Sequence, residues 1–139
     1  MSSITIDLGQ MVTADAKAEA ALAEAKAKAR RVLLEYITAA RSALVTTLPA
    51  QDMIYLAKEA EAAAWVAAAA PDLADYPLLS AEVGISAPDA DQLAQMWLNM
   101  SSMWRAAAAQ LEAIRLSRGA QIDAAETPEA ALALIADLT

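Results

Sequence analysis

The carboxylates are the side chains of this sequence whose spacing suggests a site for chemistry. Asp89 and Asp91 form a D-x-D pair of the kind found in some metal sites, and Asp72, Asp75 and Glu82 precede them. Oxygen ligands suit a hard divalent cation, but a calcium loop of the EF-hand type needs them at fixed positions around a glycine. Neither stretch has that arrangement. We therefore interpret these residues as solvated carboxylates of a loop and a helix start, and we predict no metal site.

The sequence contains no histidine and no cysteine. This excludes the Ser-His-Asp and Cys-His catalytic pairs, imidazole and thiolate metal ligands, and disulfides. The remaining general acids and bases are carboxylates, lysines and tyrosines, and they form no convergent set. We therefore predict a non-enzymatic protein with no catalytic residue, no cofactor and no small-molecule substrate.

The charge is acidic and unevenly distributed. Ten Lys and Arg stand against 18 Asp and Glu, which gives a net charge of −8. Residues 1–58 hold seven basic and six acidic side chains, whereas residues 59–139 hold three and twelve. The basic cluster of Lys26, Lys28, Arg30 and Arg31 would wrap round a helix, at about 100° per residue, instead of lining one side. Since phosphate contacts need clustered cations, we predict no nucleic-acid binding. An acidic inhibitor that binds a basic protein surface remains an alternative function.

Alanine dominates the apolar content. Hydrophobic residues make up 58% of the 139 residues, but 39 of them are alanine. Alanine is the best helix former and buries little surface. With only three glycines and five prolines, the composition predicts long helices around a thin core. We expect an all-α fold, an elongated helical bundle that self-associates.

Capping and breaking residues divide the chain into elements. Thr13 suits the N-cap of a long helix, which we expect to reach about Leu48 before Pro49 interrupts it. The packing stripe of its second half is Leu33, Ile37, Ala40, Leu44 and Leu48. A shorter second helix is expected over about residues 50–70, until Pro71. Its apolar side, where small residues would allow a close helix approach, carries Met53, Leu56, Ala57, Ala60, Ala64 and Ala67.

The second half of the chain begins with an irregular segment. Over residues 71–88 we expect one short helical turn, at about 77–83, that Gly84 stops. Ser86 is the expected N-cap of a second long helix, with Asp89 completing a capping box. Thr127 and Pro128 are expected to begin a short C-terminal helix.

The strongest periodic pattern lies in the second long helix. Large apolar residues and one alanine repeat at spacings of four and three, as in the a and d positions of a coiled coil: Leu93, Trp97, Met100, Trp104, Ala107, Leu111 and Ile114. Such a stripe is either the chain's own core or a surface for a partner, since Met and Trp are adaptable and prominent in interfaces. We take as the candidate interaction seam Leu93, Trp97, Met100, Trp104, Leu111 and Ile114.

The N-terminus shows a different pattern. Residues 4–8 alternate as Ile-Thr-Ile-Asp-Leu, which is typical of a short strand. A single strand is not stable alone. It either packs on the chain's own helices or docks on a partner through Ile4, Ile6 and Leu8, the candidate docking arm.

Several of these segments resemble a group of small Ala-rich helical proteins encoded with the tail or tail-fibre genes of tailed bacteriophages and prophages. The similar parts are residues 4–8 and 12–17, residues 71–79 (PDLADYPLL), residues 82–85, Trp97, Trp104 and residues 127–130. The resemblance implies a virion tail or tail-fibre component or, as an alternative, a tail-fibre assembly chaperone. It implies no functional residue.

The sequence thus predicts three parts: an N-terminal arm (residues 1–12), a long-helix bundle (13–126) and a short C-terminal helix (127–139). The expected partners are further copies of the chain and other phage tail or tail-fibre proteins. The uncharged apolar run at residues 62–70 is too short for a membrane span, and no signal peptide is predicted. We expect a soluble protein, made in the host cytoplasm, that ends in the virion tail.

Overall fold

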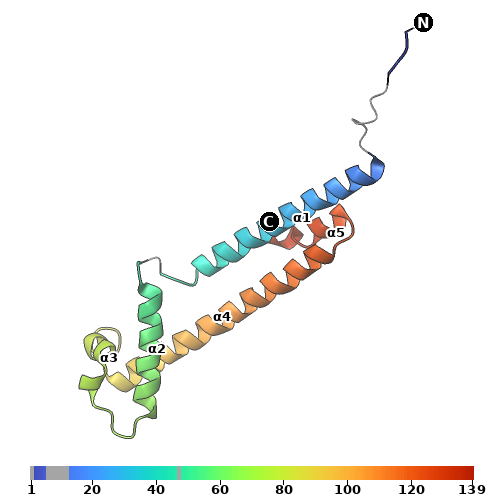
Figure 1. Ribbon diagram of the computed structural model, residues 1–139. Helices are drawn as coiled ribbons and strands as arrows, with labels where there is room; N and C mark the ends of the chain where they lie inside the picture. The colour runs from blue at the N-terminus through green and yellow to red at the C-terminus, as the bar shows by residue number, and fades with distance from the viewer. Residues whose placement is uncertain (1, 6–12, 47) are drawn as a thin grey trace. The chain divides into compact units, whose positions relative to one another are not determined.

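The structure, a computed structural model, describes residues 2–5, 13–46 and 48–139. Within these ranges every regular element is helical, and the single β feature is an isolated bridge between Val83 and Ala87. Two long α-helices, α1 (Ala14–Ser42) and α4 (Ala90–Ala124), are accompanied by α2 (Gln51–Ala67), α3 (Pro77–Glu82) and α5 (Pro128–Ala133) (Figure 1). Two 3-10 turns, η2 (Leu73–Asp75) and η3 (Ala136–Leu138), complete the set. The predicted all-α class is confirmed.

The chain contacts group into two compact units. Unit 1 consists of Met1–Ile37 and Ile114–Thr139, and unit 2 of Thr38–Ala113. This grouping differs from the three parts expected from the sequence, because the N-terminal part of α1 packs with the C-terminal part of the chain. The predicted boundaries at residues 12 and 126 stay a prediction about folding units.

Unit 1 is held by buried alanine, leucine and isoleucine side chains and by ion pairs. Its buried side chains include Ala25, Ala29, Leu33 and Ile37 of α1, and Ile122, Ala131 and Ile135 from the other end of the chain. Asp123 forms an ion pair with Arg30 and accepts a hydrogen bond from the Lys26 ammonium at its carbonyl oxygen. The first half of α1 is therefore packed through its alanines, whereas the sequence favoured burial of the second half alone.

The helix α1 ends six residues before the predicted boundary at Leu48. After Ser42 the chain turns, and Leu44 and Leu48 of the expected stripe are exposed. Val and Thr at positions 45 and 46 are poor helix formers, and Pro49 disfavours a helical conformation at the residue before it. The helix stops where intrinsic propensity falls.

Unit 2 contains α2, α3 and the first part of α4. The Gly84 stop after α3 is confirmed, since Gly84 takes a φ of 86° in the left-handed region. Ala50 takes the same region at the start of α2, with a φ of 62° and no side-chain cap. The two expected caps at Thr13 and Thr127 are confirmed by hydroxyl oxygens that accept from Ala16 N and Ala130 N, each at 3.1 Å.

The predicted N-cap of α4 was wrong. Asp89, not Ser86, accepts from the first turn, with its Oδ1 2.8 Å from Gln92 N. The Ser86 hydroxyl instead donates to Glu82 Oε1 at 2.7 Å. Because α4 begins at Ala90, the residue directly before it occupies the cap position, and a carboxylate there also favours the positive end of the helix dipole.

Candidate interaction surface

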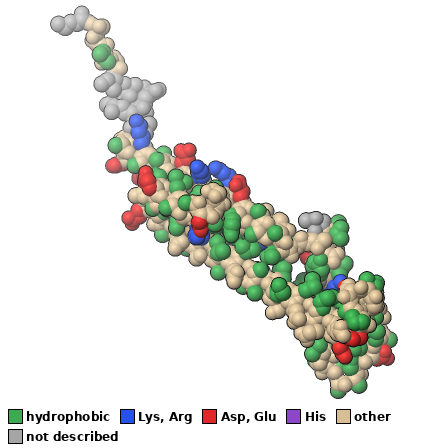
Figure 2. All heavy atoms as spheres, turned by 180° about the vertical axis from the view of Figure 1, so that it is seen from behind, with side chains coloured by type: hydrophobic (Ala, Val, Ile, Leu, Met, Phe, Trp, Pro, Cys, Tyr) green, Lys and Arg blue, Asp and Glu red, His purple; other side chains and the backbone are tan. Residues whose placement is uncertain are grey.

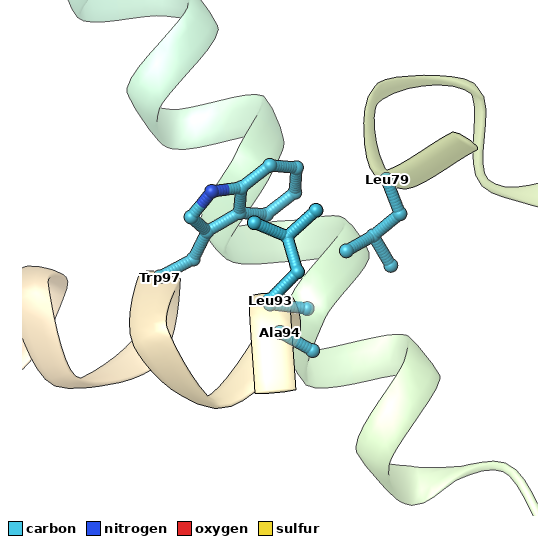
Figure 3. Packing of buried hydrophobic residues seen from close by; sticks show 5 residues of the cluster. Leu79, Leu93, Ala94 and Trp97 are labelled. Carbon is cyan, nitrogen blue, oxygen red and sulfur yellow. The ribbon is translucent and has the colours of Figure 1, made fainter. Parts of the chain in front are cut away.

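The first turns of α4 form the core of unit 2. Leu93, Ala94 and Trp97 are buried together with Ala62 of α2 and Leu79 of α3. In Figure 3 the three α4 side chains and Leu79 converge on the side of α2 that faces them. Two residues of the predicted seam, Leu93 and Trp97, are thus core residues of the single chain.

A part-buried ion pair borders this core. The Lys58 ammonium of α2 pairs with Glu82 at the end of α3, and it lies 4.9 Å from the centroid of the Trp97 ring. Burial by itself would raise the pKa of Glu82. The hydrogen bonds from Lys58 and Ser86 lower it by more than burial raises it, so the pKa lies below its ordinary value of 4.5. Lys58 therefore joins α2, α3 and α4 at one point.

Two further polar contacts fix α2 in unit 2. The Glu61 carboxylate accepts from the backbone amides of Leu78 and Leu79 at 2.9 to 3.1 Å, which satisfies the free amides at the start of α3. The Trp65 indole donates to Asp91 Oδ1 at 2.7 Å. These contacts belong to one side of α2, which faces the interior of unit 2 and carries Lys58, Glu61, Ala62 and Trp65.

Four of the five carboxylates first considered as metal ligands have structural roles. Asp89 caps α4, Asp91 accepts from Trp65, Glu82 pairs with Lys58, and Asp72 Oδ1 accepts from Ala74 N at 3.0 Å. Within residues 2–5, 13–46 and 48–139, no three residues of the types His, Cys, Asp and Glu gather as a possible metal site.

The seam changes character beyond Trp97. Met100, Met103 and Trp104 are 57%, 74% and 45% exposed, and we name these three the α4 apolar surface. Leu111 and Ile114, further along the seam, are half-buried. At about 100° per residue, Met100 lies about 20° round the helix from Leu93, and Trp104 lies about 20° from Trp97, so exposure changes with position along α4 and not with the side of the helix. The stripe that begins as core therefore continues into solvent.

Large apolar side chains are exposed on α1, α2 and α4. Figure 2 shows hydrophobic side chains across the face that it displays, with charged ones scattered among them. Exposed apolar patches on soluble proteins often mark interaction sites. Sequence periodicity found Met100 and Trp104, but it could not separate them from Leu93 and Trp97, because all four fit one heptad pattern.

The docking arm is only partly described. Ile4 is 89% exposed, whereas Ile6 and Leu8 lie outside the described residues. Docking through this arm stays a prediction.

No family model, curated protein or solved structure matches the chain. Among the described residues, no helix combines the length and apolar character needed to cross a membrane.

Proposed function

We propose that this chain is a non-enzymatic structural or adaptor protein that acts by packing its helices against copies of itself and against other proteins. The observation that carries the proposal is the α4 apolar surface, where the helix that supplies the core of unit 2 presents Met100, Met103 and Trp104 to solvent. Exposure of two methionines and a tryptophan on one helix is unfavourable in an isolated chain, and their burial against a partner would relieve it.

The engaged carboxylates support a non-enzymatic role. General acid or base catalysis needs a group that can reach a substrate. Here Asp89 caps α4, Asp91 accepts a hydrogen bond from the Trp65 indole, and Glu82 pairs with the Lys58 ammonium.

The proposed setting is the tail of a bacteriophage, as a virion component with other tail or tail-fibre proteins as partners. This part rests on the resemblance to small helical proteins encoded with tail genes, which covers residues 4–8, 12–17, 71–79, 82–85 and 127–130 together with Trp97 and Trp104. Two other functions remain alternatives: a tail-fibre assembly chaperone in the same setting, and an acidic inhibitor that binds a basic protein surface in the cytoplasm.

The role of the α4 apolar surface is tested with Met103→Glu. Since Met103 is 74% exposed, a charge there leaves the monomer intact but opposes burial in an interface. Ala109→Glu is the control, because Ala109 is exposed on the same helix and lies about 120° away from Met103. Light scattering over a range of concentrations should show assembly of the wild type and of Ala109→Glu, and weaker assembly of Met103→Glu. Equal behaviour of the two variants would exclude this surface.

The setting is tested by a mass-spectrometric inventory of purified virions. A structural component is present in a fixed ratio to the other tail proteins, whereas a chaperone is found in the lysate and is absent from the virion. An acidic inhibitor is recognised by binding to its target that weakens steeply with added salt.

A further inference from the structure

The helix α2 has two unlike sides. Lys58, Glu61, Ala62 and Trp65 face the interior of unit 2, as described above. The opposite side is apolar and exposed over the whole helix, and we name it the α2 outer face: Met53, Leu56, Ala57, Ala60, Ala63, Ala64 and Ala67. It includes every residue that the sequence had assigned to the packing side of this helix.

The charged residues of α2 do not interrupt this face. After Asp52 in the first turn, the helix carries Lys58, Glu59 and Glu61. Lys58 pairs with Glu82, Glu59 pairs with Arg105 at 2.7 Å, and Glu61 accepts from the amides at the start of α3. Each of these groups is satisfied within the chain, so covering the outer face would leave none of them without its partner.

The large residues of the face are grouped at one end. Met53 and Leu56, which are 68% and 62% exposed, lie in the first half of α2, and the second half carries only alanines. We infer that α2 pairs with α2 of a second copy in antiparallel orientation, with Ala60 at the two-fold axis. This inference rests on the proposed self-association, but it assigns a surface other than the α4 apolar surface.

The distribution of side-chain size identifies the occupant as a second copy. With Ala60 opposite Ala60, Met53 lies opposite Ala67, and Leu56 lies opposite Ala64 of the other copy. Each large side chain then meets a small one, so the helix axes can stay at one separation along the pair. In a parallel pair Met53 would meet Met53 and Ala67 would meet Ala67, which leaves one end crowded and the other open. A two-fold axis gives the same contact to both copies.

The area is sufficient for a pair. A helix of 17 residues is about 25 Å long. Seven apolar side chains on one side of it bury on the order of 500 Å² per copy, or roughly 1,000 Å² in total, which is the lower limit for a specific interface. We therefore expect a dimer that forms at moderate concentration and separates on dilution.

Single cysteines test the pairing directly, because the chain contains no cysteine of its own. In the inferred pair, the two copies of Ala60→Cys face each other within disulfide reach, whereas the two copies of Ala67→Cys lie about 21 Å apart along the helices. Mild oxidation should therefore cross-link Ala60→Cys rapidly and Ala67→Cys only slowly. A mixture of Met53→Cys and Ala67→Cys should give the mixed product. Equal cross-linking of Ala60→Cys and Ala67→Cys, or none at Ala60→Cys, overturns the antiparallel pair.

A charge on the outer face gives the second test. Ala60 is exposed, so Ala60→Glu should keep the helical circular dichroism of the wild type, but it should raise the dimer dissociation constant at least roughly tenfold by burying unpaired charge. Ala109→Glu again serves as the matched control. A dimer that survives Ala60→Glu and is lost with Met103→Glu overturns the α2 pair and leaves the proposed function standing. The reverse pattern supports the α2 pair and excludes the α4 apolar surface. A wild-type chain that stays monomeric at all concentrations overturns both.

Discussion

The two tryptophans of the seam allow a direct measurement of where the core ends. Trp97 is 6% exposed and belongs to the buried cluster of unit 2, whereas Trp104 is 45% exposed on the same helix. In the sequence the two tryptophans occupy equivalent positions of the same heptad pattern. The structure predicts that Trp97→Ala is the more destabilising change in the monomer.

The magnitude follows from the buried area. A buried tryptophan removes roughly 200 Å² from water, which corresponds to about 5 kcal/mol at 25 cal/mol per Å². This is an upper value, because the unfolded chain already buries part of that area. We therefore expect Trp97→Ala to lower the free energy of unfolding by ~3 to 5 kcal/mol, as in other large-to-small core substitutions. Trp104 buries about half as much and its site is open to solvent, so Trp104→Ala should cost only ~2 kcal/mol.

The measurement is urea denaturation followed by far-ultraviolet circular dichroism, at a concentration where the chain is monomeric and again where it assembles. The loss from Trp97→Ala should be the same at both concentrations, because its contacts lie within the chain. The loss from Trp104→Ala should grow with concentration if Trp104 is also covered by a partner. Trp97→Phe keeps an aromatic ring and should lower the free energy of unfolding by less than Trp97→Ala. The assigned core boundary is wrong if these two variants lose the same stability, or if Trp97→Ala and Trp104→Ala lose the same stability in the monomer.

Four further predictions concern the backbone and the polar contacts of unit 2. Ala50→Gly should stabilise the chain by up to ~1 kcal/mol, since Ala50 has a φ of 62° in the left-handed region. Gly84→Ala should destabilise it by ~1 kcal/mol through the backbone φ of 86° alone, because an added Cβ meets no atom within 4 Å. The melting temperatures of the two variants check both predictions. Glu82→Gln should reduce the acid sensitivity of the urea midpoint. The pKa of Glu82 is lowered below 4.5, so its contribution is complete above about pH 4.5 and is lost as the pH falls through the folded-state pKa; an unchanged pH profile would contradict the Lys58 pair. Asp89→Ala should cost ~1 kcal/mol by removing the cap of α4, and an unchanged melting temperature would contradict the assigned cap.

Local signals were sufficient for the helices and for most of their ends. Alanine content and spacing predicted the long helices, and Thr13, Gly84 and Thr127 marked boundaries that the structure confirms. These features depend on a few neighbouring residues, so a short stretch of sequence contains the information. The end of α1 was misplaced because apolar periodicity continues through Leu44 and Leu48 beyond the point where helix propensity ends.

What the sequence by itself determined is therefore that the chain is helical and where most helices begin and end, because hydrogen bonding within a helix and its caps is local. Only the tertiary structure decided which side of each helix is covered. Alanine fits a buried or an exposed position almost equally well, since its side chain is too small to require either. Hence the pattern of α2 could not reveal that Lys58, Glu61 and Trp65 turn inward to satisfied polar contacts while the alanine side stays exposed. Likewise, one heptad stripe on α4 is core at Leu93 and Trp97 and surface at Met103, because α2 and α3 cover only its first turns.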